Sequence, residues 1–165
     1  MNEAMMIALK ENTNTLAKAL SAFDYVHFNR HPADGGWTAG EIAEHLLLFD
    51  LRITNVFSGK TAPSDRDPQA NINAMQDRMA DRVNRIDAPT FLVPSTTAKD
   101  PVTLTQKILD QRCIISIMIT DQDITVLLPD SPHRFYGIMS AVEWVQFLIH
   151  HCNRHIEQLR ELAGS

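Results

Sequence analysis

Seven histidines occur in this chain of 165 residues, and three of them lie close together near its C-terminal end, at His150, His151 and His155. His151 and His155 are four positions apart, so on a helix their Cβ atoms lie on one face, about 5–6 Å from each other. Two imidazoles at this spacing can share one metal ion. The pair alone is a weak signal, because a buried histidine is more often a hydrogen-bonded core residue. His150 is the main alternative ligand, but it points about 100° away from His151 around a helix and cannot share a face with His155.

A third imidazole, His45, lies in an apolar stripe of another segment, between Ile42 and Phe49. Three neutral imidazoles from two facing helices leave at least one coordination position open, which is typical of catalytic rather than structural zinc-type sites. The alternative is a scatter of core and surface histidines, in which each buried ring nitrogen needs a protein or water partner. Spacing alone leaves both interpretations open.

The other histidines and the two tryptophans have simpler interpretations. His27 and His31 flank a predicted loop, and His133 lies in a proline-containing link between two helical segments. Trp37 and Trp144 are expected to be core or interface aromatics. None of these five residues is predicted to bind a ligand.

The elements that position the histidines are predicted to be helices, because apolar residues recur at steps of three, four and seven in four long segments. We expect these segments, at about residues 3–22, 38–58, 100–121 and 140–163, to form a four-helix bundle, an all-α fold. An additional helix is predicted over residues 72–87, and its polar outer face indicates that it covers the bundle from outside. Its apolar positions are Ile72, Met75, Met79, Val83 and Ile86.

Local signals mark where the helices begin and which faces are buried. Thr38 can cap the N-terminus of the second segment while Glu41 reciprocates, and Pro101 suits the first position of a later helix. Thr13 lies on the expected buried stripe of the first helix. Residues 113–119 are rich in isoleucine, as in a strand, but they keep the helical period and are predicted to be helical.

The composition restricts the classes of function. The net charge of −5, the pI near 5.7 and the lack of a basic cluster argue against nucleic-acid binding. No apolar stretch approaches the roughly 20 residues that cross a bilayer, and no secretory signal is present, so we expect a cytoplasmic protein without a membrane segment. Residues 1–165 are long and apolar enough for a single domain. Cys113 and Cys152 are expected to be reduced, buried thiols.

Two stretches resemble the DinB-like superfamily, which includes YfiT-type metal-dependent hydrolases and bacillithiol S-transferases. They are WTAGEIAEHL at residues 37–46 and EWVQFLIHHCNRHIEQL at residues 143–159, and the second is the more specific. The resemblance implies a four-helix bundle with a divalent metal, nickel or zinc, between the second and last major helices. It places the metal ligands at His45, His151 and His155, and it implies a homodimer.

Several functions remain open at this point. A bound metal can lower the pKa of a water or hold a thiol as thiolate, so the resemblance implies a hydrolase or thiol S-transferase acting on a small molecule, including a low-molecular-weight thiol as cosubstrate. Glu41, Glu44 and Glu157 are the nearest carboxylates in sequence, although a helix cap and solvated charges explain them more simply. The alternatives are a non-catalytic metal or small-ligand binding protein of stress response, and a helical dimer with no site. A deep, polar, open cavity above the histidines would favour catalysis, whereas an apolar plug over a coordinatively full ion would favour binding or structure.

Overall fold

The computed structural model describes residues 2–33, 35–81 and 87–164. All of the regular elements in these ranges are helices, as the sequence predicts. They are α1 (Asn2–Leu20), α2 (Tyr25–Phe28), α3 (Ala39–Phe57), α4 (Ile72–Ala80), the short 3-10 helix η1 (Thr90–Leu92), α5 (Pro101–Asp121) and α6 (Ala141–Ala163).

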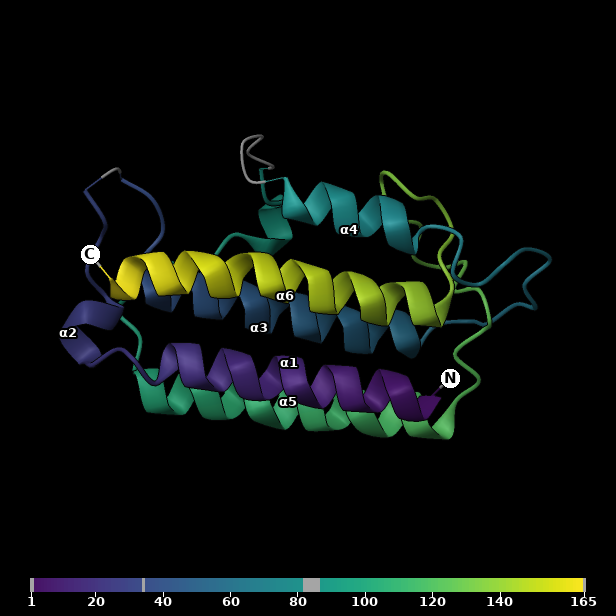
Figure 1. Ribbon diagram of the computed structural model, residues 1–165, viewed down its shortest axis with the longest axis horizontal. Coiled ribbons are helices and arrows are strands. Elements are labelled where there is room, and N and C mark those ends of the chain that lie inside the picture. The colour runs from purple at the N-terminus through teal and green to yellow at the C-terminus, as the bar shows by residue number, and fades with distance from the viewer. Residues whose placement is uncertain (1, 34, 82–86, 165) are drawn as a thin grey trace.

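Four long helices lie side by side and form the bundle (Figure 1). Both α1 and α3 contact α5 and α6, so each bundle helix has two neighbours around a shared core. The shorter α4 packs on α6 from outside, on the side away from α1 and α5. The predicted four-helix bundle with a covering helix is therefore confirmed. None of the described helices is long and apolar enough to cross a membrane.

The helices that carry the three histidines, α3 and α6, both begin with a capping box. Thr38 accepts a hydrogen bond from the backbone N–H of Glu41, and the Glu41 carboxylate accepts one from the N–H of Thr38. Ser140 and Glu143 make the same reciprocal pair at the start of α6. These bonds satisfy N–H groups that no helical carbonyl can reach. The predicted cap before α5 is also present, because Asp100 accepts from the N–H of Thr103.

The covering helix is shorter than predicted. It ends at Ala80, and Asp81 has an extended backbone with φ −70° and ψ 103°, whereas the apolar period predicts a helix as far as Asp87. Val83 and Ile86, the last two positions of that period, lie outside the described residues. Arg154 of α6 donates to the backbone carbonyls of Met79 and Asp81, so the chain that leaves α4 is held against α6.

Two predictions about side-chain burial need correction. In α1 the polar residue that enters the core is Asn12, which is 6% exposed, whereas Thr13 is half-buried. Asn12 is buried because it bonds to Arg112 and Asn153 on two other helices. Cys113 is exposed rather than buried, while Cys152 is buried as predicted.

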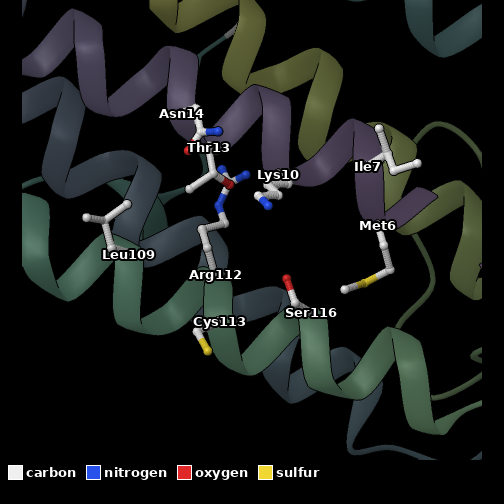
Figure 2. A pocket seen from close by; sticks show the side chains of 9 residues that line it. All are labelled: Met6, Ile7, Lys10, Thr13, Asn14, Leu109, Arg112, Cys113 and Ser116. Carbon is white, nitrogen blue, oxygen red and sulfur yellow. The ribbon is translucent and has the colours of Figure 1, made fainter. Parts of the chain in front are cut away.

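The exposed Cys113 lines a shallow groove of about 330 Å³ between α1 and α5 (Figure 2). Its thiol lies on the outer side of α5, because the core positions of that helix are occupied by Leu104, Ile108, Ile115 and Ile119. The groove contains none of the seven histidines.

A layer of polar residues divides the core of the bundle into two apolar clusters. On α1 the polar position is Asn12, between Leu9 of one cluster and Leu16 of the other. On α3 it is Asp50 and on α5 it is Arg112, each again between members of the two clusters. Polar residues at these positions interrupt an otherwise regular apolar stripe on each helix.

Candidate metal centre

The structure brings the side chains of His45, His151 and His155 together between α3 and α6. The Nε2 atom of His151 lies 3.1 Å from Nε2 of His45 and 3.1 Å from Nε2 of His155. One ligand nitrogen from each ring lies within 4.8 Å of the other two. The residues that spacing selects therefore converge on one point.

The separation of the nitrogens fits a divalent ion bound between them. Metal–nitrogen distances of about 2.0–2.1 Å place two ligand nitrogens about 2.9 Å apart at right angles and about 3.3 Å apart at tetrahedral angles. Both 3.1 Å separations around His151 lie between these values. The three rings are steeply inclined to one another, with interplanar angles of 62° to 83°, so their nitrogens point inward from different directions.

Hydrogen bonds on the far side of two rings determine which nitrogen carries a lone pair. Nδ1 of His45 lies 2.8 Å from the carbonyl oxygen of Leu92, in η1, and Nδ1 of His155 lies 2.5 Å from Oε1 of Gln158. A carbonyl oxygen only accepts, so each Nδ1 carries the proton and each Nε2 has a free lone pair. Nδ1 of His151 has no hydrogen-bond partner among the described residues. Such bonds to metal-binding histidines orient the ring and fix its tautomer.

The three imidazoles are neutral at neutral pH, which is the form that binds metals. Burial lowers the pKa of His45 below its ordinary value. Burial, with the nearby His45 adding to the effect, lowers the pKa of His155 to about 3. Burial and the adjacent His155 and His45 lower the pKa of His151 well below its ordinary value.

Aromatic rings surround the histidine cluster and hold the imidazoles in place. The ring of Trp37 lies 5.0 Å from that of His45, centroid to centroid, and the ring of Phe49 lies 4.5 Å from that of His151. Phe147 stacks on His151 at 6.1 Å with an interplanar angle of 11°. The histidine cluster is thus set in a largely apolar, aromatic wall.

The same three histidines line a cavity of about 1040 Å³, which is large enough for a small organic molecule. Its wall is built from α3, α6, the end of α4, η1 with the residues before it, the loop before α3 and the link before α6. Trp37 and Trp144, predicted to be ordinary core or interface aromatics, both line this cavity. The cavity leaves open space beside the three histidines.

The carboxylates nearest in sequence do not contact the three histidines. Glu41 is used in the capping box, Glu44 pairs with Lys99 at 3.2 Å, and Glu157 pairs with Arg160. Among the described residues, Asp87 and Glu161 are the carboxylates that line the cavity.

The other four histidines are not part of the cluster, but one of them, His133, lines the same cavity. His150 is not part of the group that could hold a metal, as its helical position predicts. His27 pairs with Asp24, and Nδ1 of His31 faces the carbonyl of Gly36. His133, predicted to be an ordinary loop residue, instead lines the cavity within a group of aromatic rings.

Sequence reasoning missed His133, Leu92 and Gln158. Leu92 and His133 carry no local signal, because each reaches the site through a loop whose course depends on packing. Gln158 is three positions after His155 on the same helix, so the spacing could have indicated their contact.

Comparison with known proteins identifies the family of this chain. The family model of the DinB superfamily matches residues 8–159. An uncharacterized protein, YuaE of Bacillus subtilis (strain 168), is 24% identical over 142 residues, which cover 81% of this chain and 82% of that protein. No solved structure shows significant similarity to the chain. Because the family model spans nearly the whole chain, including all three histidines, the protein belongs to the DinB superfamily.

Proposed function

We propose that this protein is a metal-dependent enzyme that acts on a small molecule, with a nickel or zinc ion held by His45, His151 and His155. The observation that carries the proposal is the convergence of three neutral imidazoles, with two lone pairs fixed by hydrogen bonds, at the wall of a large cavity. Three protein ligands leave a position for a water or a substrate atom.

The ion would act as a Lewis acid and would lower the pKa of a bound water or thiol, so that the ligand loses its proton near neutral pH. The protein's own groups would do the rest. Leu92 and Gln158 hold two rings in the binding tautomer, and the aromatic wall excludes bulk water from one side of the site. Hydrolysis and thiol S-transfer both fit this arrangement, with a low-molecular-weight thiol as cosubstrate in the second case.

A second candidate function is metal or small-ligand binding without turnover, as in a stress-response protein. The apolar and aromatic character of the wall near His45 and His151 supports it, since such walls retain ligands as well as substrates. We also propose that the protein is a homodimer. The exposed isoleucines Ile7, Ile114 and Ile117, on α1 and α5, support an interface there.

Metal content tests the proposed ligands directly. Protein made without a polyhistidine tag should contain about one divalent ion per chain by elemental analysis. His155→Ala should lose the ion, because two imidazoles remain, whereas the matched control His150→Ala should keep it. Loss in the His150 variant with retention in the His155 variant would show that the ligands are misassigned.

The same samples distinguish an enzyme from a binding protein. Wild type should turn over one of a panel of esters, amides and thiol acceptors, and both a chelator and His155→Ala should abolish that turnover. Stoichiometric metal without chelator-sensitive turnover would favour the binding function.

A further inference from the structure

The cavity extends from the histidines toward a second, positively charged end. Arg52 lines it from α3, seven positions after His45, so both residues lie on one face of the helix. At a rise of 1.5 Å per residue, their backbone positions are roughly 10 Å apart along the axis. Arg52 is half-buried, and no ion pair or hydrogen bond within the described residues holds its guanidinium.

His133 also lines the cavity, from the link before α6. Its ring lies 4.8 Å from Phe147, whose other neighbours include Phe49, one turn before Arg52. Backbone bonds of 2.7 Å and 2.8 Å pair His133 with Gly137, whose φ of 64° is a left-handed conformation that favours glycine. The turn therefore fixes the backbone of His133.

The tautomer of His133 is determined in the same way as those of the metal-site histidines. Its Nδ1 accepts a hydrogen bond from the backbone N–H of Phe135 at 3.3 Å. A neutral ring that accepts at Nδ1 carries its proton on Nε2. Burial, with the charges of Arg134 and Arg78, lowers the pKa of His133 to about 4, so the ring stays neutral and offers one N–H donor.

Two more guanidinium groups lie beside this histidine. The guanidinium carbon of Arg78 is 3.5 Å from the ring centroid of Phe135, and that of Arg134 is 4.5 Å from it. Neither arginine forms an ion pair with a carboxylate among the described residues. Of these two residues, Arg134 lines the cavity, so its guanidinium is the one that can meet a ligand there.

The positive charge at this end contrasts with the rest of the molecule, which carries a net charge of −5. A concentration of arginines inside the cavity of an acidic protein would repel cations and attract anions locally. Guanidinium groups also bind carboxylates and phosphates through paired hydrogen bonds, which a neutral ligand cannot match.

We propose that the end of the cavity formed by Arg52, His133 and Arg134 binds an anionic group of the substrate, while the reacting atom lies at the three histidines. The inference rests on the proposed function and narrows its substrate class. The ligand is a small molecule with a carboxylate or similar anion roughly 10 Å from the atom that reacts, two helical turns along α3.

A matched pair of hydroxamates tests this inference by binding alone. Suberic acid monohydroxamate and octanohydroxamic acid share a metal-binding head and chain length, and they differ only in a terminal carboxylate in place of a methyl group. Calorimetry on zinc-loaded wild type should show the carboxylate probe binding at least about tenfold more tightly. Arg52→Gln should reduce that preference to less than about threefold, while the control Arg160→Gln, on the outside of α6, should leave it unchanged.

A second variant tests the subsite independently, in case Arg52→Gln changes the folding of the protein. His133→Phe keeps an aromatic ring in the group but removes the N–H donor, and it should lower the preference for the carboxylate probe without weakening octanohydroxamic acid. Equal binding of the two probes by wild type would overturn the anionic subsite. Failure of both probes to bind would instead contradict the metal site, and with it the proposed function on which this inference rests.

Discussion

A histidine binds a metal only through a nitrogen with a free lone pair, so the hydrogen bond on its other nitrogen matters as much as its position. In His45 and His155 that bond goes to an oxygen, which leaves Nε2 unprotonated and directed at the cluster. His133 has the opposite arrangement, with Nδ1 as acceptor and Nε2 as donor. The same residue type is therefore present as two different tautomers in one cavity.

The buried histidines also predict how the metal-free protein responds to acid. In the unfolded chain His155 is protonated below about pH 6.5, whereas in the folded protein its pKa is about 3. Between these values the unfolded state binds more protons, so the free energy of unfolding falls as the pH falls from 6.5 toward 3. For one such histidine we expect a loss of about 2 kcal/mol at pH 5.

Urea unfolding of metal-free wild type and His155→Gln, from neutral pH to about pH 4, measures this loss. The variant should show a shallower decline, because glutamine does not titrate. Parallel pH profiles for the two proteins would contradict the assignment of a lowered pKa to His155.

At the scale of elements, the site depends on how α3 and α6 are aligned. His45 lies opposite His151, and Phe49 lies opposite Phe147, with ring centroids 5.0 Å and 5.5 Å apart. The two helices are therefore antiparallel, and a shift of one residue in either would separate the rings. Their starting points are set by two capping boxes that the structure shows in full.

The capping box of α6 should be more sensitive to substitution than the capping box of α3. Glu143 is fully buried, and its carboxylate accepts hydrogen bonds from Arg66 and from the backbone N–H groups of Ser140 and Asn71. Glu143→Gln places an amide donor against these donors, so we expect a loss of about 2–4 kcal/mol in unfolding free energy. The exposed Glu3, in the first turn of α1, is the control, and Glu3→Gln should change stability by less than about 0.5 kcal/mol. Equal changes in unfolding free energy in the two variants would show that the buried carboxylate of Glu143 does not stabilise the fold.

At the scale of the whole molecule, one polar network joins all four bundle helices. Arg112 of α5 donates to Asp50 of α3 at 2.5 Å and to Asn12 of α1 at 3.0 Å. Asn12 in turn donates to Asn153 of α6 at 2.8 Å. A buried network with such specific partners favours one register of the four helices over others.

Removal of one charge from this network should lower the free energy of unfolding. Arg112 is 1% exposed and Asp50 is fully buried, so Asp50→Asn leaves a guanidinium buried without its counter-ion. We expect unfolding free energy to fall by about 3–5 kcal/mol in chemical denaturation. The double variant Asp50→Leu with Arg112→Met should recover much of this loss, because it removes both charges. A single variant as stable as wild type would show that the pair contributes little.

The sequence by itself determined the features that depend on residues a few positions apart. The apolar periods and the cap at Thr38 predicted the bundle helices, and the four-residue spacing of His151 and His155 together with the resemblance of the two motifs predicted the three candidate ligands. Helix formation and capping are local, so they can be read from neighbouring residues. The end of α4 was missed because Asp81 is extended within an otherwise regular period.

Only the tertiary structure decided which atoms meet. The separation of the Nε2 atoms, the cavity beside them, the entry of His133 and the exposure of Cys113 all depend on how separate elements pack. Asn12 rather than Thr13 is buried because its partners are supplied by α5 and α6. The physical reason is that helical periodicity defines a face of each helix, whereas side chains from other elements determine what that face contacts.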